Sequence, residues 1–287
     1  MKQAVLLAAL GFLCATASGQ AADMAGAGET EQEKIRLIVK QVLREYAATL
    51  NEKAGNEAAK AILKNLIQDN QAFVRDHKPA YFSHFQTAQH PRATVVTCSD
   101  SRVHTHALDA TPDGDLFMVR NIGNQISTAE GSVEYGVHHL HTPLLLIVGH
   151  VACGAIQAAA GDYSKESGPI RNELDTIRIP KGEGGLSSVK LNVNNQVRQA
   201  MNKFEDEILK GTLTVVGAVY DFKNEMGKGQ GKLNIINVNG ETDPVRLAKL
   251  DLMQGLDAPP ARPTRASRRI MGEKAAPATK TEESAGH

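Results

Sequence analysis

Three reactive side chains stand at alternate positions in the stretch VVTCSDSRV, namely Cys98, Asp100 and Arg102. In an extended segment alternate side chains point the same way, so these three share a face. The stretch follows the β-branched run ATVVT at 93–97, which predicts a strand. We therefore expect a thiolate, a carboxylate and a guanidinium side by side just beyond the carboxyl end of a strand. That is the edge at which α/β sheets bind their ligands.

A second reactive pair follows another apolar run. LLLIVG at 144–149 continues into HVACG, which places His150 and Cys153 at the exit of a predicted strand and at the start of a small-residue segment. A helix that begins there would lower the pKa of Cys153 through its N-terminal dipole and so favour the thiolate. Two thiolates and one imidazole are a zinc ligand set, and three protein ligands leave a fourth position for water.

Length and charge restrict the classes of protein that fit. A chain of 287 residues with 41% hydrophobic residues can bury a core of its own. Its 32 lysines and arginines balance its 32 aspartates and glutamates, so no electrostatic footprint for nucleic acid or for an anionic membrane is visible. We therefore expect a small-molecule partner and no nucleic acid.

Residues 1–22 have the pattern of a cleaved secretory signal peptide. One lysine precedes the apolar run AVLLAALGFLCATA, which is too short to span a bilayer, and small residues follow it. A buried N-terminal helix is the less favoured alternative, because polar MAGAGETEQEK comes directly afterwards. The chain is therefore expected to be exported, to the periplasm of a bacterium, with no membrane attachment after cleavage. The mature chain would keep two cysteines, Cys98 and Cys153.

The chain from 29 to 256 has the pattern of a single α/β domain. Helical spacing of apolar residues predicts two amphipathic helices, at 30–51 and 56–73. Short apolar runs then alternate with helical stretches, which favours a mostly parallel sheet with helices on both faces. The predicted strands lie at 93–97, 116–119, 144–149 and 213–221. From 257 to 287 a composition rich in proline, alanine and charge predicts a disordered tail.

Each part of the reactive pattern also has a simpler explanation. Cys98 could be a buried apolar residue, and His150 an ordinary histidine near a helix start. The two cysteines could form a disulfide, which is the strongest alternative for an exported protein. A disulfide, however, needs neither a histidine three residues before Cys153 nor charged side chains two and four residues after Cys98. A purely structural zinc would normally have four protein ligands.

Four segments together match one enzyme family: CSDSR at 98–102, FMVRNIGN at 117–124, SVEYGV at 132–137 and GHVACGA at 149–155. The pair CxDxR and HxxC is specific in combination. On these segments, which span most of the mature domain, the chain resembles the β-class carbonic anhydrases. The resemblance implies a parallel-centred α/β sheet, N-terminal helices that pack on a partner subunit, and a homodimer or a higher homo-oligomer.

The resemblance also implies roles for individual residues. Cys98, His150 and Cys153 would hold one Zn²⁺ per chain. Asp100 and Arg102 would form a catalytic dyad. The implied reaction is the reversible hydration of carbon dioxide to bicarbonate and a proton by a zinc-bound hydroxide. Asp100 would orient that hydroxide, and Arg102 would keep Asp100 ionised and turned away from the metal.

Three more positions match substrate-binding positions of the family, and each has a simpler explanation. Gln89, in the QHP stretch before the first strand, could equally be a solvated loop amide. Tyr135 matches an aromatic residue of the substrate pocket but could be a core tyrosine. Gly154 matches a glycine near the substrate but could simply allow a tight turn between strand and helix.

Other functions and states stay open at this point. A zinc-storage or interaction protein would keep the ligands but would have no use for Asp100 and Arg102. A lyase or hydrolase that acts on carbon disulfide or carbonyl sulfide would look almost the same at the metal. The family also includes members whose aspartate is the fourth zinc ligand, and the sequence does not separate the two arrangements.

Overall fold

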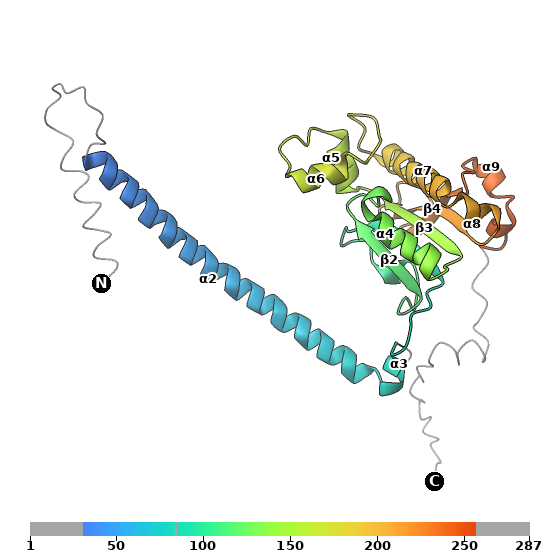
Figure 1. The fold of residues 1–287 in the computed structure, drawn as a ribbon, viewed down its shortest axis with the longest axis horizontal. Helices are drawn as coiled ribbons and strands as arrows, with labels where there is room; N and C mark the ends of the chain where they lie inside the picture. Colours follow the sequence, from blue (N-terminus) through green and yellow to red (C-terminus); the bar gives the residue numbers. More distant parts are fainter. Residues whose placement is uncertain (1–30, 84, 257–287) are drawn as a thin grey trace, which may run out of the picture. The chain divides into compact units, whose positions relative to one another are not determined.

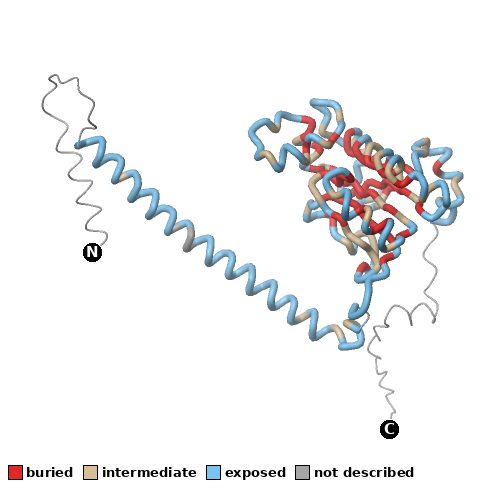
Figure 2. Tube along the Cα trace, in the orientation of Figure 1, coloured by how far each residue is buried: buried red, intermediate tan, exposed pale blue. Residues whose placement is uncertain are grey.

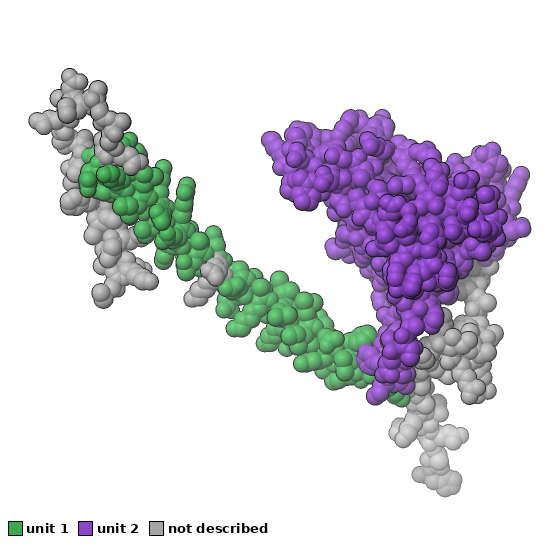
Figure 3. Space-filling view, viewed as in Figure 1, with its two compact units in different colours: residues 1–78 green, residues 79–287 purple. Residues whose placement is uncertain are grey.

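The computed structural model describes residues 31–83 and 85–256 (Figure 1). The predicted signal peptide at 1–22 and the predicted tail at 257–287 lie outside the described residues, so both stay predictions. The chain divides into two compact units between Lys78 and Pro79 (Figure 3). Within the described ranges, no helix combines the length and the apolar composition that a membrane crossing needs.

The first unit contains one long helix, α2 (Glu31–Asp76). Helical structure is confirmed here, but the predicted division into helices at 30–51 and 56–73 is wrong. The intervening stretch holds a single glycine, Gly55, and one glycine in an exposed helix costs only about 1 kcal/mol. Figure 2 shows α2 as an almost entirely exposed helix. Its exposed residues include large apolar ones: Ile35, Leu37, Ile38, Val42, Leu43, Tyr46, Ile62, Leu63, Leu66 and Ile67.

The second unit is built on a five-stranded sheet in the order β2-β1-β3-β4-β5. The first four strands are parallel: β1 (Ala93–Cys98), β2 (Leu116–Asn121), β3 (Leu144–His150) and β4 (Thr214–Asp221). The predicted mostly parallel α/β architecture is therefore confirmed. The edge strand β5 (Lys232–Val238) pairs antiparallel with β4 and was not predicted. Its run KLNIINV is interrupted by asparagines, which weakens the apolar signal of a strand.

Helices cover one face of this sheet well. The long helix α7 (Leu186–Lys203) packs on β3 and β4, where Gly149 and Gly217 leave room for Val193. The main core under this face also receives side chains from α4 (Glu130–Glu134), η3 (Tyr135–His139), α5 (Gly154–Ala160), α6 (Gly168–Leu174) and α8 (Glu205–Leu209).

The opposite face is covered less completely. Its apolar clusters include residues of η1 (Thr105–Ala107), α9 (Pro244–Leu247) and η4 (Asp251–Met253). Val95 and Val148 are fully buried on this face, but four other strand side chains are only partly buried: Leu116, Met118, Leu144 and Leu146. The prediction of helices over both faces is therefore confirmed, with the longer helices on one face and only short ones on the other. The remaining short helices are α3 (Pro79–Ser83) and η2 (Ser127–Ala129).

Candidate metal centre

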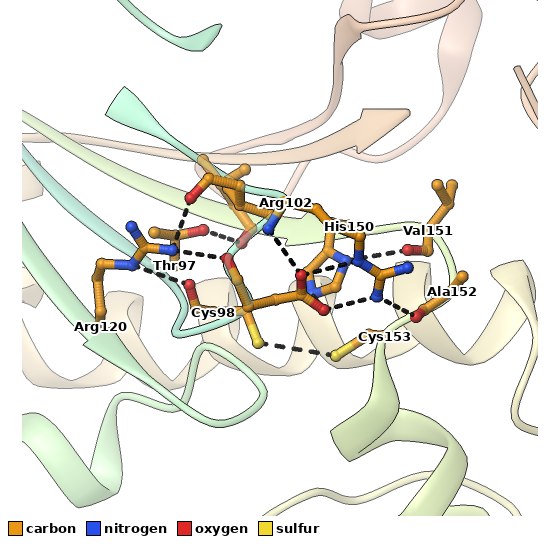
Figure 4. A network of polar contacts seen from close by, with 11 residues as sticks. Thr97, Cys98, Arg102, Arg120, His150, Val151, Ala152 and Cys153 are labelled. Atoms are coloured by element: carbon orange, nitrogen blue, oxygen red, sulfur yellow. Dashed lines mark hydrogen bonds and ion pairs between the residues drawn. The ribbon is translucent and has the colours of Figure 1, made fainter. Parts of the chain in front are cut away.

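The reactive residues meet at the carboxyl ends of β1 and β3, which are neighbouring parallel strands. From β1 the chain crosses to β2 on one side and later returns to β3 on the other, so the strand order switches here. Such a switch point is where open α/β sheets bind ligands. Cys98 is the last residue of β1, and His150 is the last residue of β3. The topology therefore brings these two side chains together (Figure 4).

A tight turn after β3 then brings Cys153 into the group. The backbone N–H of Val151 donates to the carbonyl of Tyr220 in β4, at 3.2 Å. Ala152 adopts a left-handed conformation with φ of 52°, which reverses the chain, and Cys153 precedes the first turn of α5. This conformation is unfavourable for a residue with a Cβ, so contacts must hold it. One such contact is the Arg102 guanidinium, which donates to the Ala152 carbonyl at 3.0 Å.

Cys98, His150 and Cys153 form a buried cluster whose ligand atoms all lie within 4.8 Å of one another. The two Sγ atoms are 4.0 Å apart, and both cysteines are free thiols. The structure therefore does not support the disulfide alternative, since a disulfide bond is about 2.05 Å long. Two sulfurs bound to one tetrahedral zinc at about 2.3 Å would stand roughly 3.8 Å apart. The spacing of the sulfurs thus fits zinc.

One ring nitrogen of His150 has no hydrogen-bond partner among the described residues. Its Nδ1 donates to the Val151 carbonyl at 2.9 Å, which places the ring proton on Nδ1 and leaves a lone pair on Nε2. The ring is fully buried, yet Nε2 accepts no hydrogen bond. A buried polar atom without a partner is costly and calls for an explanation. A metal ion bound by this cluster would be the missing partner of Nε2.

The two thiols differ in acidity. The hydrogen bond from the Cys153 thiol lowers the pKa of Cys98 to about 4, although burial acts in the opposite direction. The neighbouring His150 side chain and the backbone N–H groups of Gly123 and Asp100 lower the pKa of Cys98 further. The same thiol pairing, burial and the charge of Cys98 raise the pKa of Cys153. The N–H groups at the start of α5 act as predicted, but the Cys98 thiolate outweighs them.

Asp100 and Arg102 pair next to the cluster. The backbone N–H and Nε of Arg102 each donate to Asp100 Oδ1 at 2.9 Å, and Nη2 donates to Oδ2 at 2.6 Å. These hydrogen bonds hold the pKa of Asp100 well below its ordinary value, against a smaller effect of burial. Asp100 Oδ2 lies 3.8 Å from His150 Nε2. The structure thus has an ionised Asp100 turned to Arg102 and close to the ligands.

Arg120 was not singled out from the sequence, yet it holds the loop that carries the dyad (Figure 4). From the end of β2, its guanidinium donates to the carbonyls of Cys98 at 3.1 Å, Asp100 at 2.8 Å and Val103 at 2.6 Å. An arginine directly after the apolar run LFMV was the available signal, because such a charge needs a specific partner.

A buried network of amide side chains supports the loop after β2. Gln125 Nε2 donates to the Gly123 carbonyl at 2.5 Å and to Asn192 Oδ1 at 2.9 Å. Asn192 in α7 donates to the same Gly123 carbonyl at 2.9 Å, and Gln196 donates to Gln125 Oε1 at 2.9 Å. The network therefore fixes the residue whose backbone N–H faces Cys98. No local pattern in the sequence predicts this network, because its members lie 67 to 71 residues apart.

The three predicted substrate-binding residues lie in different settings. Gln89 is exposed between α3 and β1, and no hydrogen bond found within the described ranges joins it to the cluster. Tyr135 is 43% exposed, and its ring packs against Phe117 and His139. Gly154 is the first residue of α5, and a Cβ there would meet no atom within 4 Å. The structure therefore places Gly154 beside the cluster with open space next to it, while the roles of Gln89 and Tyr135 stay predictions.

Comparison with known proteins extends these observations. A family model described as carbonic anhydrase matches residues 93–229. A carbonic anhydrase of Mycolicibacterium smegmatis is 34% identical over 147 residues, which are 46% of this chain and 71% of that protein. Carbonic anhydrase 2 of Mycobacterium tuberculosis is 29% identical over 180 residues, which are 56% of this chain and 87% of that protein.

Solved structures share the fold. A tetrameric β-carbonic anhydrase of Sordaria macrospora has a TM-score of 0.52 at 24% identity, covering 61% of this chain and 96% of that chain. A Coccomyxa β-carbonic anhydrase in complex with acetazolamide has a TM-score of 0.52 at 24% identity, covering 64% of this chain and 90% of that chain. Together with the Cys-His-Cys cluster, these matches show that the chain belongs to the β-carbonic anhydrases, zinc enzymes that hydrate carbon dioxide.

Proposed function

We propose that this protein catalyses the reversible hydration of carbon dioxide to bicarbonate and a proton, with one zinc ion held by Cys98, His150 and Cys153. The observation that carries the proposal is the buried His150 Nε2, which has no hydrogen-bond partner among the described residues, next to two free thiols 4.0 Å apart. When bound, zinc lowers the pKa of a water ligand and so supplies a nucleophile near neutral pH. Three protein ligands leave room for that water.

Asp100 supplies the acceptor that orients the nucleophile. Oδ1 accepts two hydrogen bonds from Arg102 and Oδ2 accepts one, so Oδ2, the oxygen nearer to His150, keeps a further lone pair. An ionised carboxylate can only accept, so a water near it must donate to it and turn its own lone pair elsewhere. Arg102 also donates to the Ala152 carbonyl, which ties the dyad to the turn between His150 and Cys153. This pairing distinguishes an enzyme from a protein that merely stores zinc.

The residues around the cluster would receive the substrate. The open space at Gly154 gives a small linear molecule access beside Cys153. The half-exposed ring of Tyr135 would form part of the pocket wall. Exposed Gln89 would donate a hydrogen bond to substrate across an interface between subunits. These three roles belong to the proposal.

We further propose that the protein acts as a homodimer or a higher homo-oligomer. Apolar side chains along α2 are exposed, and on the less covered sheet face the side chains of Leu116, Met118, Leu144 and Leu146 are only partly buried. Apolar surface of this kind is favourably covered by a second copy. The similar enzymes of Sordaria macrospora are tetrameric. Export to the bacterial periplasm is also proposed, and N-terminal sequencing of the exported protein tests it.

Stopped-flow measurement of carbon dioxide hydration, with metal analysis of the same sample, tests the function. Asp100→Asn should keep about one zinc per chain and lose turnover about a hundredfold or more, because an amide does not replace the carboxylate as acceptor. Arg102→Ala should lose a similar factor, because it frees Asp100. Asp206→Asn, at an aspartate whose side chain is 80% exposed, is the matched control. Near-parent turnover in both dyad variants, with zinc bound, would contradict the proposal.

A further inference from the structure

Phe222, which neither binds the metal nor belongs to the dyad, contacts a member of each group. The Cζ atom of Arg102 lies 4.9 Å from the centroid of the Phe222 ring, over its face. The same ring is stacked against the imidazole of His150, with centroids 6.1 Å apart and planes inclined by 29°. One aromatic side chain therefore connects the dyad with a ligand of the cluster.

The turn after β4 holds Phe222 firmly. Asp221, the last residue of β4, is fully buried. Its carboxylate accepts hydrogen bonds from the backbone N–H groups of Lys223 at 3.2 Å, Glu225 at 3.0 Å and Met226 at 2.7 Å. These bonds anchor the residues on the far side of Phe222 to the end of the strand. The ring is thus fixed by backbone geometry as well as by its own packing between two apolar clusters.

Arg102 needs support of this kind. Its side chain is 49% exposed, and a long side chain in contact with water loses conformational entropy when it is held in one rotamer. The guanidinium carbon lies over the face of the Phe222 ring, while the N–H groups of the guanidinium donate to Asp100 and Ala152. A cation over an aromatic face is attracted to it, so the ring favours this rotamer without competing for its hydrogen bonds.

We propose that Phe222 is a positioning residue that holds Arg102 in the rotamer that keeps Asp100 away from the metal ligands. The inference rests on the proposed function of the dyad. Asp100 Oδ2 is already 3.8 Å from His150 Nε2, so a small rotation would bring it to the cluster. Without the ring, Arg102 leaves its rotamer more often, and Asp100 is released with it.

Two substitutions distinguish the effect of the aromatic ring of Phe222 from the effect of an apolar side chain at this position. Phe222→Leu removes the aromatic face and keeps an apolar side chain, whereas Phe222→Tyr keeps the face. We expect Phe222→Leu to lower kcat about fivefold with unchanged zinc content, and Phe222→Tyr to stay within about twofold of the parent. Lys223→Ala lies in the same turn, where the lysine pairs only with Glu225 among the ion pairs of the described chain, and serves as the control.

Cobalt in place of zinc gives a readout that does not depend on turnover. The visible absorption spectrum of the cobalt protein reports the ligand set, so Phe222→Leu should shift it in the same direction as Arg102→Ala. Lys223→Ala and Phe222→Tyr should leave the spectrum unchanged. An unchanged spectrum in Phe222→Leu would overturn the positioning role.

A double-mutant cycle shows whether Phe222 acts through Arg102. In an Arg102→Ala background, Phe222→Leu should change kcat by less than about twofold. Equal effects in both backgrounds would overturn the inference. Failure of the proposed function looks different, because Arg102→Ala would then keep parent turnover by itself. If Phe222→Leu does not fold, Phe222→Met, which is also unbranched at Cβ and has no ring, takes its place in the cycle.

Discussion

Similar apolar side chains are exposed in helix α2 and buried in the sheet unit. In the sheet, Val95, Val96 and Ile147 are fully buried. In α2, the side chains of Ile38 and Leu66 are 61% and 60% exposed. Figure 2 shows the contrast as red strands and an almost uniformly pale blue helix. Both regions are regular secondary structure, so the difference lies in what covers them.

This difference separates the chemistry from the assembly. The three cluster residues and the dyad all come from the ends of β1 and β3 and the turns that follow them, within one chain. Metal binding therefore needs no second copy. Exposed apolar surface, by contrast, is unfavourable by roughly 25 cal/mol per Å² and is stabilised when a partner covers it. Substitutions of the cluster residues at the strand ends should lower the zinc content per chain, and substitutions on α2 should weaken the association of the subunits.

Cys98→Ser should have the largest effect of all. A serine hydroxyl stays protonated near neutral pH and is a poor zinc ligand compared with a thiolate. Zinc content should fall to about one-tenth or less per chain, and hydration activity should fall by roughly three orders of magnitude, because the metal supplies the nucleophile. Metal analysis and stopped-flow kinetics measure both, with exposed Ser101→Ala as control.

The assembly of Cys98→Ser should match that of the parent in light scattering. Retained zinc with parent activity would show that Cys98 is not a ligand. Loss of assembly together with zinc would break the separation of chemistry from assembly.

The double substitution Leu63→Glu and Leu66→Glu should weaken the assembly and leave the zinc content unchanged. These side chains are 57% and 60% exposed on α2, and a buried glutamate at an interface is strongly unfavourable. The dissociation constant of the oligomer should rise about a hundredfold or more, while zinc per chain stays the same. Size-exclusion chromatography with light scattering measures it, and Lys64→Glu in the same turn is the control. An unchanged oligomer would exclude this face of α2 from the interface.

The strand ends could be predicted because they depend on local patterns. Uninterrupted apolar runs end at Cys98 and His150, and parallel strands place their carboxyl ends at one edge. The single helix α2 could not be predicted, because the polar stretch around Gly55 is compatible with a loop and with an exposed helix alike. Strand β5 was not predicted because Asn234 and Asn237 occupy buried positions that usually hold apolar residues.

The supporting contacts of the site depend on distant segments, and no local pattern carries them. Arg120 reaches the Cys98 carbonyl across 22 residues, and Phe222 reaches His150 from another strand end. The order of the two thiol pKa values likewise depends on a sulfur separation of 4.0 Å. The sequence alone indicated a helix start beside Cys153, but not that the Cys98 thiolate would outweigh it.

Arg120→Ala should have an intermediate effect. It removes hydrogen bonds to three loop carbonyls and so loosens the dyad without touching a ligand. Turnover should fall about tenfold with zinc retained, as for other outer partners of metal sites. Arg120→Lys should recover only part of the loss, because one ammonium group cannot span three carbonyls as the guanidinium does. Arg198→Ala, at an exposed arginine of α7, is the control, and parent turnover in Arg120→Ala would refute the role.

The smallest effect concerns Asp221, which anchors the turn of Phe222. Burial raises the pKa of Asp221, but the backbone N–H groups of Met226, Glu225 and Lys223 act against it, and the net pKa is below its ordinary value. A carboxyl group with a lower pKa in the folded state contributes stability that is present above its unfolded pKa of about 3.9. That contribution is lost as pH falls through the folded pKa.

The Tm of the parent should therefore exceed that of Asp221→Asn by about 3 °C or more near pH 7, and this difference in Tm should narrow below about pH 4. Zinc release in acid affects both proteins and largely cancels in this difference. A gap that widens on acidification would mean that the ionised carboxylate does not stabilise the turn.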